Sequence, residues 1–193
     1  MAEISSVITA QRYAQGFTFG DYLKSIGENR SRFDPHISAF KLAAADAQSF
    51  KDIVKKVGAV KVVAIGEDWC PDVHRGLPIM AKIAEASGMD LRFFPRDKNL
   101  DIMSLFLKEG KYQSIPVFAF FNGNLKYLCH WIERPEAATR FQDEIRAELA
   151  QQKLSEEDTR KAMRERTGPL TESWRQETVR EIKELLAKTA QRR

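Results

Sequence analysis

Apolar positions along the middle of the chain change repeatedly between helical and strand-like spacing. Apolar side chains recur every three to four residues between 37 and 57, which predicts a helix that ends at Gly58. The Asn122-Gly123 pair predicts a tight hairpin that leads into a return strand at 125–132. Continuous apolar runs predict three buried strands before that strand, at 61–66, 91–95 and 117–121. Helical spacing predicts three further helices, at 71–87, 100–108 and 136–151.

This order of elements predicts an α/β fold built on a mixed sheet. The strands are expected to be mostly parallel, with an antiparallel hairpin at one edge and helices on both faces. We assign this domain to residues 37–151. Residues 1–36 are expected to form a short helical arm that packs on the domain, and residues 152–193 a C-terminal helical extension.

The last helix, which begins near Thr171, has an apolar stripe on one side. Two uses of this stripe are open: it packs on the domain, or it forms a surface for a homodimer or another partner. The stripe consists of Trp174, Ile182, Leu185 and Leu186.

Composition narrows the class of protein. Of the 193 residues 43% are hydrophobic and 30% charged, which is ordinary for a soluble globular protein. The net charge of +4 is small and the basic residues are interleaved with acidic ones, so a nucleic-acid partner is not expected. Apolar runs are too short for a membrane span, and the N-terminus lacks the pattern of a signal peptide. Two cysteines without a secretion signal indicate a reducing, cytoplasmic setting.

Cys70 is the strongest candidate for chemistry. It follows a buried strand and precedes Pro71, which favours the first position of a helix. Free backbone N–H groups at a helix N-terminus stabilise an anion, so the Cys70 thiol is expected to be partly exposed, more acidic and more nucleophilic than a free cysteine. Asp72 opposes this effect by its negative charge.

Two neighbours of Asp72 are candidate modulators of the thiolate. His74 shares a helix face with Cys70, and Arg75 is adjacent; either could offset the charge of Asp72. The alternative for His74 is an ordinary solvated surface residue. Both interpretations stay open on the sequence alone.

Three motifs together resemble the thioredoxin superfamily. They are Trp69-Cys70-Pro71 at the start of a helix, Ile115-Pro116 before the third strand, and the Asn122-Gly123 hairpin. The wider pattern Glu-Asp-Trp-Cys-x-Asp is similar to a bacterial thioredoxin-like subfamily. The resemblance implies a thioredoxin fold.

The same resemblance implies a substrate groove beside Cys70. A cis-proline at Pro116 would face the thiol and present the backbone of Ile115 to a bound peptide. Trp69, Pro71 and Trp131 would shape the groove.

The chain departs from the superfamily in two positions that concern mechanism. Val73 stands where the superfamily has its second cysteine, and Ala64 stands where it has a buried acid. A lone Cys70 would form mixed disulfides with protein or low-molecular-weight thiols, and an external thiol would complete the turnover. The alternative is a non-catalytic binding or adaptor module that uses the groove and the C-terminal helices.

Cys129 and the histidines are the remaining candidates. Cys129 and Trp131 lie two residues apart on a predicted strand, hence on one sheet face, and both are expected near the mouth of the Cys70 site. Cys129 is either a second, resolving thiol or a buried cysteine that packs as a small hydrophobe. The histidines and cysteines lack the spacing of metal ligands, so neither a metal nor a cofactor is expected.

Overall fold

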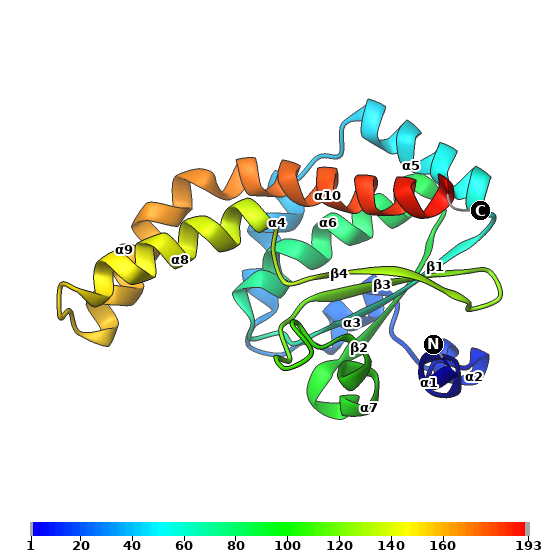
Figure 1. Cartoon of the computed structure of the whole chain (residues 1–193), viewed down its shortest axis with the longest axis horizontal. Helices are drawn as coiled ribbons and strands as arrows, with labels where there is room; N and C mark the ends of the chain where they lie inside the picture. The colour runs from blue at the N-terminus through cyan, green and yellow to red at the C-terminus, as the bar shows by residue number, and fades with distance from the viewer. Residues whose placement is uncertain (1, 192–193) are drawn as a thin grey trace.

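The computed structural model describes residues 2–191 and places a four-stranded sheet between two groups of helices (Figure 1). The strands lie in the order β2-β1-β3-β4. Helices α5, α6 and α10 cover one face, with α4 beside α6, and helices α1, α2 and α7 lie on the other (Figure 1). The strands are β1 (Val60–Gly66), β2 (Asp90–Pro95), β3 (Val117–Asn122) and β4 (Tyr127–Ile132). The helices are α1 (Ala2–Val7), α2 (Ala10–Ala14), α3 (Phe19–Ser25), α4 (Asp34–Ala39), α5 (Ala44–Val57), α6 (Pro71–Ser87), α7 (Leu100–Met103), α8 (Glu136–Ala150), α9 (Glu156–Thr167) and α10 (Thr171–Gln191).

The mixed sheet of the α/β prediction is present, but its strands are not mostly parallel. Only β1 and β2 pair in parallel; β3 is antiparallel to both β1 and β4. The connection between α7 and β3 reverses the direction of the chain, so β3 runs antiparallel to β1. Apolar runs predict that a strand is buried and leave its direction undetermined.

Two predicted helices are shorter in the structure. The helix expected at 37–57 is divided, because the chain becomes extended at Phe40, whose side chain is buried in the core, and turns helical again only at α5. The helix expected at 100–108 ends as a 3₁₀ turn at Phe106, after which Lys108 and Tyr112 pair across a tight loop.

The N-terminal arm is attached to the outer edge of β2. The backbone N–H groups of Phe17 and Phe93 each donate to the carbonyl of the other, at 2.9 and 2.8 Å. The Tyr22 ring lies 3.8 Å from the Phe93 ring between centroids, and Phe33 is fully buried. The arm therefore shields the exposed edge of the sheet, a position where an unpaired strand would otherwise invite association.

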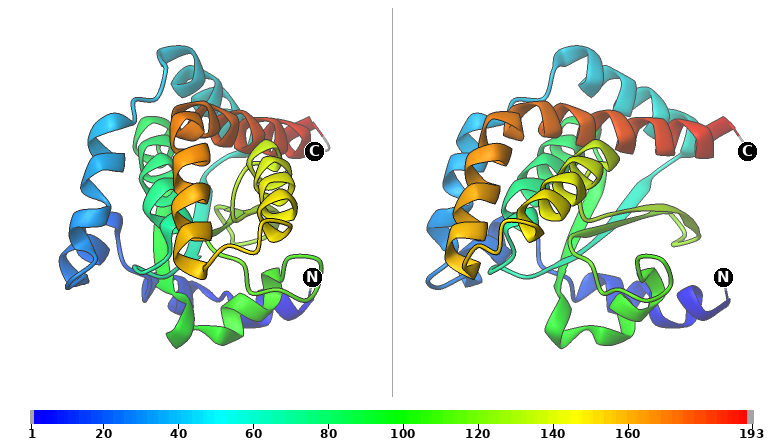
Figure 2. Two further views of the ribbon diagram at one scale, coloured as in Figure 1. Left: turned by 90° about the vertical axis from the view of Figure 1, so that its left-hand side faces the viewer. Right: turned by 60° about the vertical axis from the view of Figure 1, so that its left-hand side comes forward.

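The final helix, α10, contributes side chains to the hydrophobic core. The α10 side chains Val179, Ile182 and Leu186 are buried together with the strands of the sheet. Of the stripe predicted on this helix, Ile182 and Leu186 are fully buried in the core and Leu185 is partly buried against it. Helices α8 and α9 form a hairpin that extends beyond the sheet (Figures 1 and 2), linked by an ion pair of 2.6 Å between Arg166 and Glu148.

A histidine lies where α4 meets α10. His36 Nδ1 accepts a hydrogen bond of 3.2 Å from Nη2 of Arg175. Burial, reinforced by the charge of Arg175, lowers the pKa of His36 to about 4. An unfolded histidine has a pKa of about 6.5, so the unfolded chain takes up a proton before the folded one does.

This difference predicts a loss of stability in mild acid. As the pH falls from 7 to 5, His36 alone should lower the free energy of unfolding by about 1–2 kcal/mol. His36→Gln keeps a hydrogen-bond acceptor and removes the titration. We therefore expect its unfolding free energy, measured by urea denaturation at both pH values, to fall less than that of the unmodified protein. Equal losses in the two proteins would contradict the assignment.

Candidate functional site

Cys70 lies at the junction that the sequence predicts, between β1 and α6. It is the N-cap residue of α6, in an extended conformation, and Pro71 is the first helical residue. The Cys70 Sγ–H donates to the backbone carbonyl of Ile115, with 3.7 Å between sulfur and oxygen. The Ile115–Pro116 peptide bond is cis. The fold therefore brings together Cys70 and the Ile115–Pro116 segment, which are 45 residues apart in the chain.

The expectation of an exposed, acidic thiol is wrong. Cys70 is only 8% exposed, and burial raises the pKa of its thiol. The N–H groups of Asp72 and Val73 lower that pKa, as the helix N-terminus predicts, but the loss of hydration outweighs them. The charge of Asp72 raises the pKa further.

Asp72 is held between two arginines. Arg75, one turn further along α6, forms an ion pair with one carboxylate oxygen, which is the contact that an offset of Asp72 by Arg75 requires. Nη2 of Arg134 lies 2.7 Å from the other oxygen. Sequence reasoning missed Arg134, because Arg134-Pro135 signals only the end of a strand.

His74 fits neither of the two expectations. It is 4% exposed, its Nε2 is hydrogen-bonded to the backbone carbonyl of Asp68, and Phe33 packs edge-on against its ring at 4.9 Å. Because Nε2 faces a carbonyl oxygen, it carries the proton and donates. Burial lowers the pKa of His74 and keeps it neutral. Its role is to hold the turn before Cys70, and a residue of the N-terminal arm covers it.

The two groove tryptophans have different environments. Trp69 is 48% exposed beside Cys70, and the Arg96 guanidinium lies 5.1 Å from the centre of its ring. Trp131 is buried; it stacks on Phe118, and its Nε1–H donates to Glu181 of α10 at 2.8 Å. Helix α10 therefore covers Trp131, and Trp69 is the tryptophan that remains at the surface of the site.

Cys129 does not belong to the Cys70 site. On β4 it pairs with Phe120, five residues along the chain from the Ile115 carbonyl that Cys70 contacts. At about 3.3 Å per strand residue this separation is roughly 16 Å, whereas a disulfide needs Cα atoms within about 7 Å. Burial raises the pKa of Cys129 to about 11. Both cysteines are free thiols, and Cys129 packs as a small hydrophobic residue.

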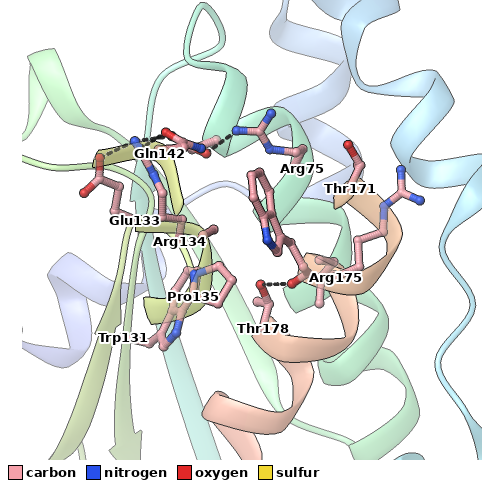
Figure 3. A pocket seen from close by; sticks show the side chains of 14 residues that line it. Arg75, Trp131, Glu133, Arg134, Pro135, Gln142, Thr171, Arg175 and Thr178 are labelled. Carbon is pink, nitrogen blue, oxygen red and sulfur yellow. Dashed lines mark hydrogen bonds and ion pairs between the residues drawn. The ribbon is translucent and has the colours of Figure 1, made fainter. Parts of the chain in front are cut away.

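A small cavity lies behind Asp72, between α6, α8 and α10. Its volume of about 20 Å³ is that of roughly one water molecule. Figure 3 shows Arg134 beside Glu133 and Gln142, with Arg75 across from it and Trp131 and Pro135 on another side. Such a cavity is too small for an organic substrate.

The described residues 2–191 contain no cluster of three or more histidine, cysteine or acidic side chains arranged to hold a metal ion. In particular the histidines His36, His74 and His130 lie in separate environments. Over the same residues, no helix combines the length and apolar character needed to cross a membrane.

Comparison with known proteins agrees with the architecture. A protein of unknown function from Pseudomonas aeruginosa has a similar crystal structure, with a TM-score of 0.63 and 12% identity; the match covers 91% of this chain and 95% of that one. An HIV epitope scaffold is also similar, with a TM-score of 0.60, 13% identity and coverage of 93% and 97%. At these identities the likeness concerns the fold alone.

The sequence itself assigns the family. None of the curated proteins matches this chain. The family model described as thioredoxin matches residues 16–149, which is more than half of the chain and includes both Cys70 and Pro116. The chain belongs to the thioredoxin family.

Proposed function

We propose that the protein is a monothiol redox protein whose Cys70 exchanges with disulfides. The observation that supports this most is the placement of the Cys70 sulfur at the start of α6, against the Ile115 carbonyl and beside the cis Ile115–Pro116 bond. Val73 occupies the position one turn on where a second thiol would resolve the reaction. A reducing cytoplasm would supply the external thiol that such a reaction needs.

The exchange has two balanced steps. The Cys70 thiolate attacks one sulfur of a disulfide R–S–S–R′, forms a bond to that sulfur and releases R′–S⁻. A second thiol, R″–SH, then loses its proton and attacks the R sulfur of the mixed disulfide. This forms R–S–S–R″ and returns Cys70 to the thiolate. Protein thiols and small cytoplasmic thiols both have the required chemistry.

Burial determines how this reaction depends on pH. Because burial raises the pKa of the Cys70 thiol, only a small fraction is thiolate near pH 7. The exchange rate should therefore increase with pH up to and beyond pH 8.5, the pKa of an ordinary free cysteine.

Mass spectrometry of the protein after incubation with oxidised glutathione tests the proposal. One glutathione adduct is expected on Cys70, formed faster at pH 9 than at pH 7 and removed by a reducing thiol. The adduct should be absent in Cys70→Ser and retained in Cys129→Ser. No adduct on Cys70 over this pH range, in folded protein, would refute thiol exchange.

A second function is favoured by the burial of Cys70 together with the exposure of Trp69. Here the protein is a non-catalytic binding module, in which Trp69 and the Ile115 backbone hold an extended peptide and Cys70 only packs. Binding of such a peptide would be unchanged in Cys70→Ser and weakened in Trp69→Ala. The thiol-exchange function predicts instead that replacing Cys70 removes all activity toward disulfides.

A further inference from the structure

The charge nearest to Cys70 along α6 is not free to move. Asp72 lies two residues after Cys70, and its side chain is only 12% exposed. Arg75 binds one of its oxygens and Arg134 the other, the latter at 2.7 Å. The Asp72 carboxylate is thus contacted by one cation at each oxygen.

Arg134 comes from a different part of the chain. It follows β4 and precedes α8, and its side chain is 14% exposed. Its other terminal nitrogen donates to Gln142 of α8, and it also pairs with Glu133 (Figure 3). Gln142 is buried and accepts a second hydrogen bond, of 3.2 Å, from Arg146. The guanidinium is thus fixed by contacts to both α6 and α8.

Three other charged or titratable groups near the site have further partners of their own, Glu133 in addition to Arg134. In the turn before Cys70, a Glu67 carboxylate oxygen accepts the Asp97 N–H at 2.7 Å. His74 is neutral and bonded to the Asp68 backbone, and Glu133 pairs with Lys108 at 2.6 Å. The charge of Asp72 raises the pKa of the Cys70 thiol, and the charge of Arg134 lowers it.

We propose that Arg134 is a positioning residue for Cys70: it neutralises and fixes the Asp72 carboxylate, and so sets the electrostatic field at the sulfur from the junction of β4 and α8. This inference deepens the proposed function, on whose thiol chemistry it rests. It makes the α8 contacts of Arg134 part of what determines how readily Cys70 ionises.

The test is the pH dependence of iodoacetamide alkylation at Cys70, read by mass spectrometry in a Cys129→Ser background. Without Arg134, Asp72 keeps only its ion pair with Arg75, and the positive charge of Arg134 near the sulfur is lost. The midpoint is the pH at which the alkylation rate reaches half of its maximum. In Arg134→Gln this midpoint should rise by about one pH unit, so alkylation at a fixed lower pH becomes about tenfold slower. Arg134→Lys retains the positive charge and should recover most of the rate. Asp72→Asn should shift the midpoint downward.

The double variant separates an indirect role from a direct one. Because the charge of Arg134 also lowers the pKa of the thiol directly, Arg134→Gln should still shift the midpoint when Asp72→Asn is already present, but by clearly less than when Asp72 is intact; the difference is the part that acts through Asp72. An equal shift in both backgrounds would overturn the inference, because Arg134 would then act by its own charge alone and not through Asp72. A midpoint that is unchanged in Arg134→Gln, with only the melting temperature lowered, would also overturn it.

Alkylation does not require disulfide exchange, so the two proposals can fail separately. Suppose that oxidised glutathione leaves Cys70 unmodified, while the alkylation midpoints of the single and double variants shift as expected. The exchange function is then refuted and the role of Arg134 stands. If the glutathione adduct forms but the midpoints do not depend on Arg134, the role of Arg134 is refuted and the exchange function stands. Should Arg134→Gln fail to fold, an unchanged or raised midpoint in Asp72→Asn alone would still overturn the inference.

Discussion

Val73→Cys is expected to form an intramolecular disulfide with Cys70 and to resolve mixed disulfides without an external thiol. Val73 is fully buried one turn into α6, three residues after Cys70. Residues three apart on a helix have Cβ atoms about 5–6 Å apart, and small backbone adjustments at a helix start bring this within disulfide range. The thioredoxin family places its second cysteine at this position.

The reaction of this variant with oxidised glutathione should stop at a different product. In the unmodified protein, Cys70 should keep the glutathione. In Val73→Cys, the new thiol attacks the Cys70 sulfur of the adduct, releases reduced glutathione and leaves a disulfide within the chain. Intact mass measured after trapping free thiols distinguishes the adduct from the internal disulfide. The internal disulfide should change from absent to the main product.

Val73→Ser is the matched control, since it has the same small size and no thiol. It should retain the glutathione adduct, as the unmodified protein does. Both variants lose packing around Gly66, where even an added Cβ would lie only 2.8 Å from a Val73 methyl, so each should be destabilised by about 1 kcal/mol or more. If folded Val73→Cys gave neither adduct nor internal disulfide, Cys70 would be unreactive and the binding-module function would gain support.

Phe33→Ala should have the largest effect on stability among the residues of the N-terminal arm. Phe33 is fully buried and contacts Tyr22 edge-on at 6.3 Å and His74 at 4.9 Å between ring centroids. Truncating a buried phenylalanine to alanine removes its hydrophobic contribution and leaves a cavity, which together lower the free energy of unfolding by about 3–5 kcal/mol. Urea denaturation measures this change.

Phe17→Ala is the control for this prediction. Phe17 lies in the same arm, but its side chain is 39% exposed and its attachment to β2 is through the backbone, which alanine retains. Its loss in unfolding free energy should be well below that of Phe33→Ala. Similar losses for the two variants would show that the arm is held by its backbone pairing and not by Phe33.

The local elements of the fold were predictable because their signals are local. Apolar runs locate the strands, Gly58 and Gly88 adopt the positive φ angles that end α5 and α6, and Asn122-Gly123 marks the turn between β3 and β4. The direction of β3 was not predictable in this way. It depends on where the preceding loop delivers the chain, and periodicity carries no information on that point.

The candidate site was predictable in its position and not in its environment. Cys70 and Pro116 could be placed from motifs, whereas the exposure of Cys70 depends on segments distant in the chain that pack around it. The burial of His74 depends on Phe33 in the arm, and that of Trp131 on Glu181 in α10. Burial is a property of the whole fold, so the expected acidic thiol could be corrected only when desolvation was known.

The helix α10 has a consequence for how this protein is divided into parts. The family similarity ends at residue 149, yet Val179, Ile182 and Leu186 belong to the same hydrophobic core as the strands. The segment that the family model matches is therefore shorter than the segment that builds the hydrophobic core. A protein shortened to residues 16–149 would expose the apolar side chains that α10 covers on α5, α6 and β4, and self-association of the shortened chain is the expected consequence.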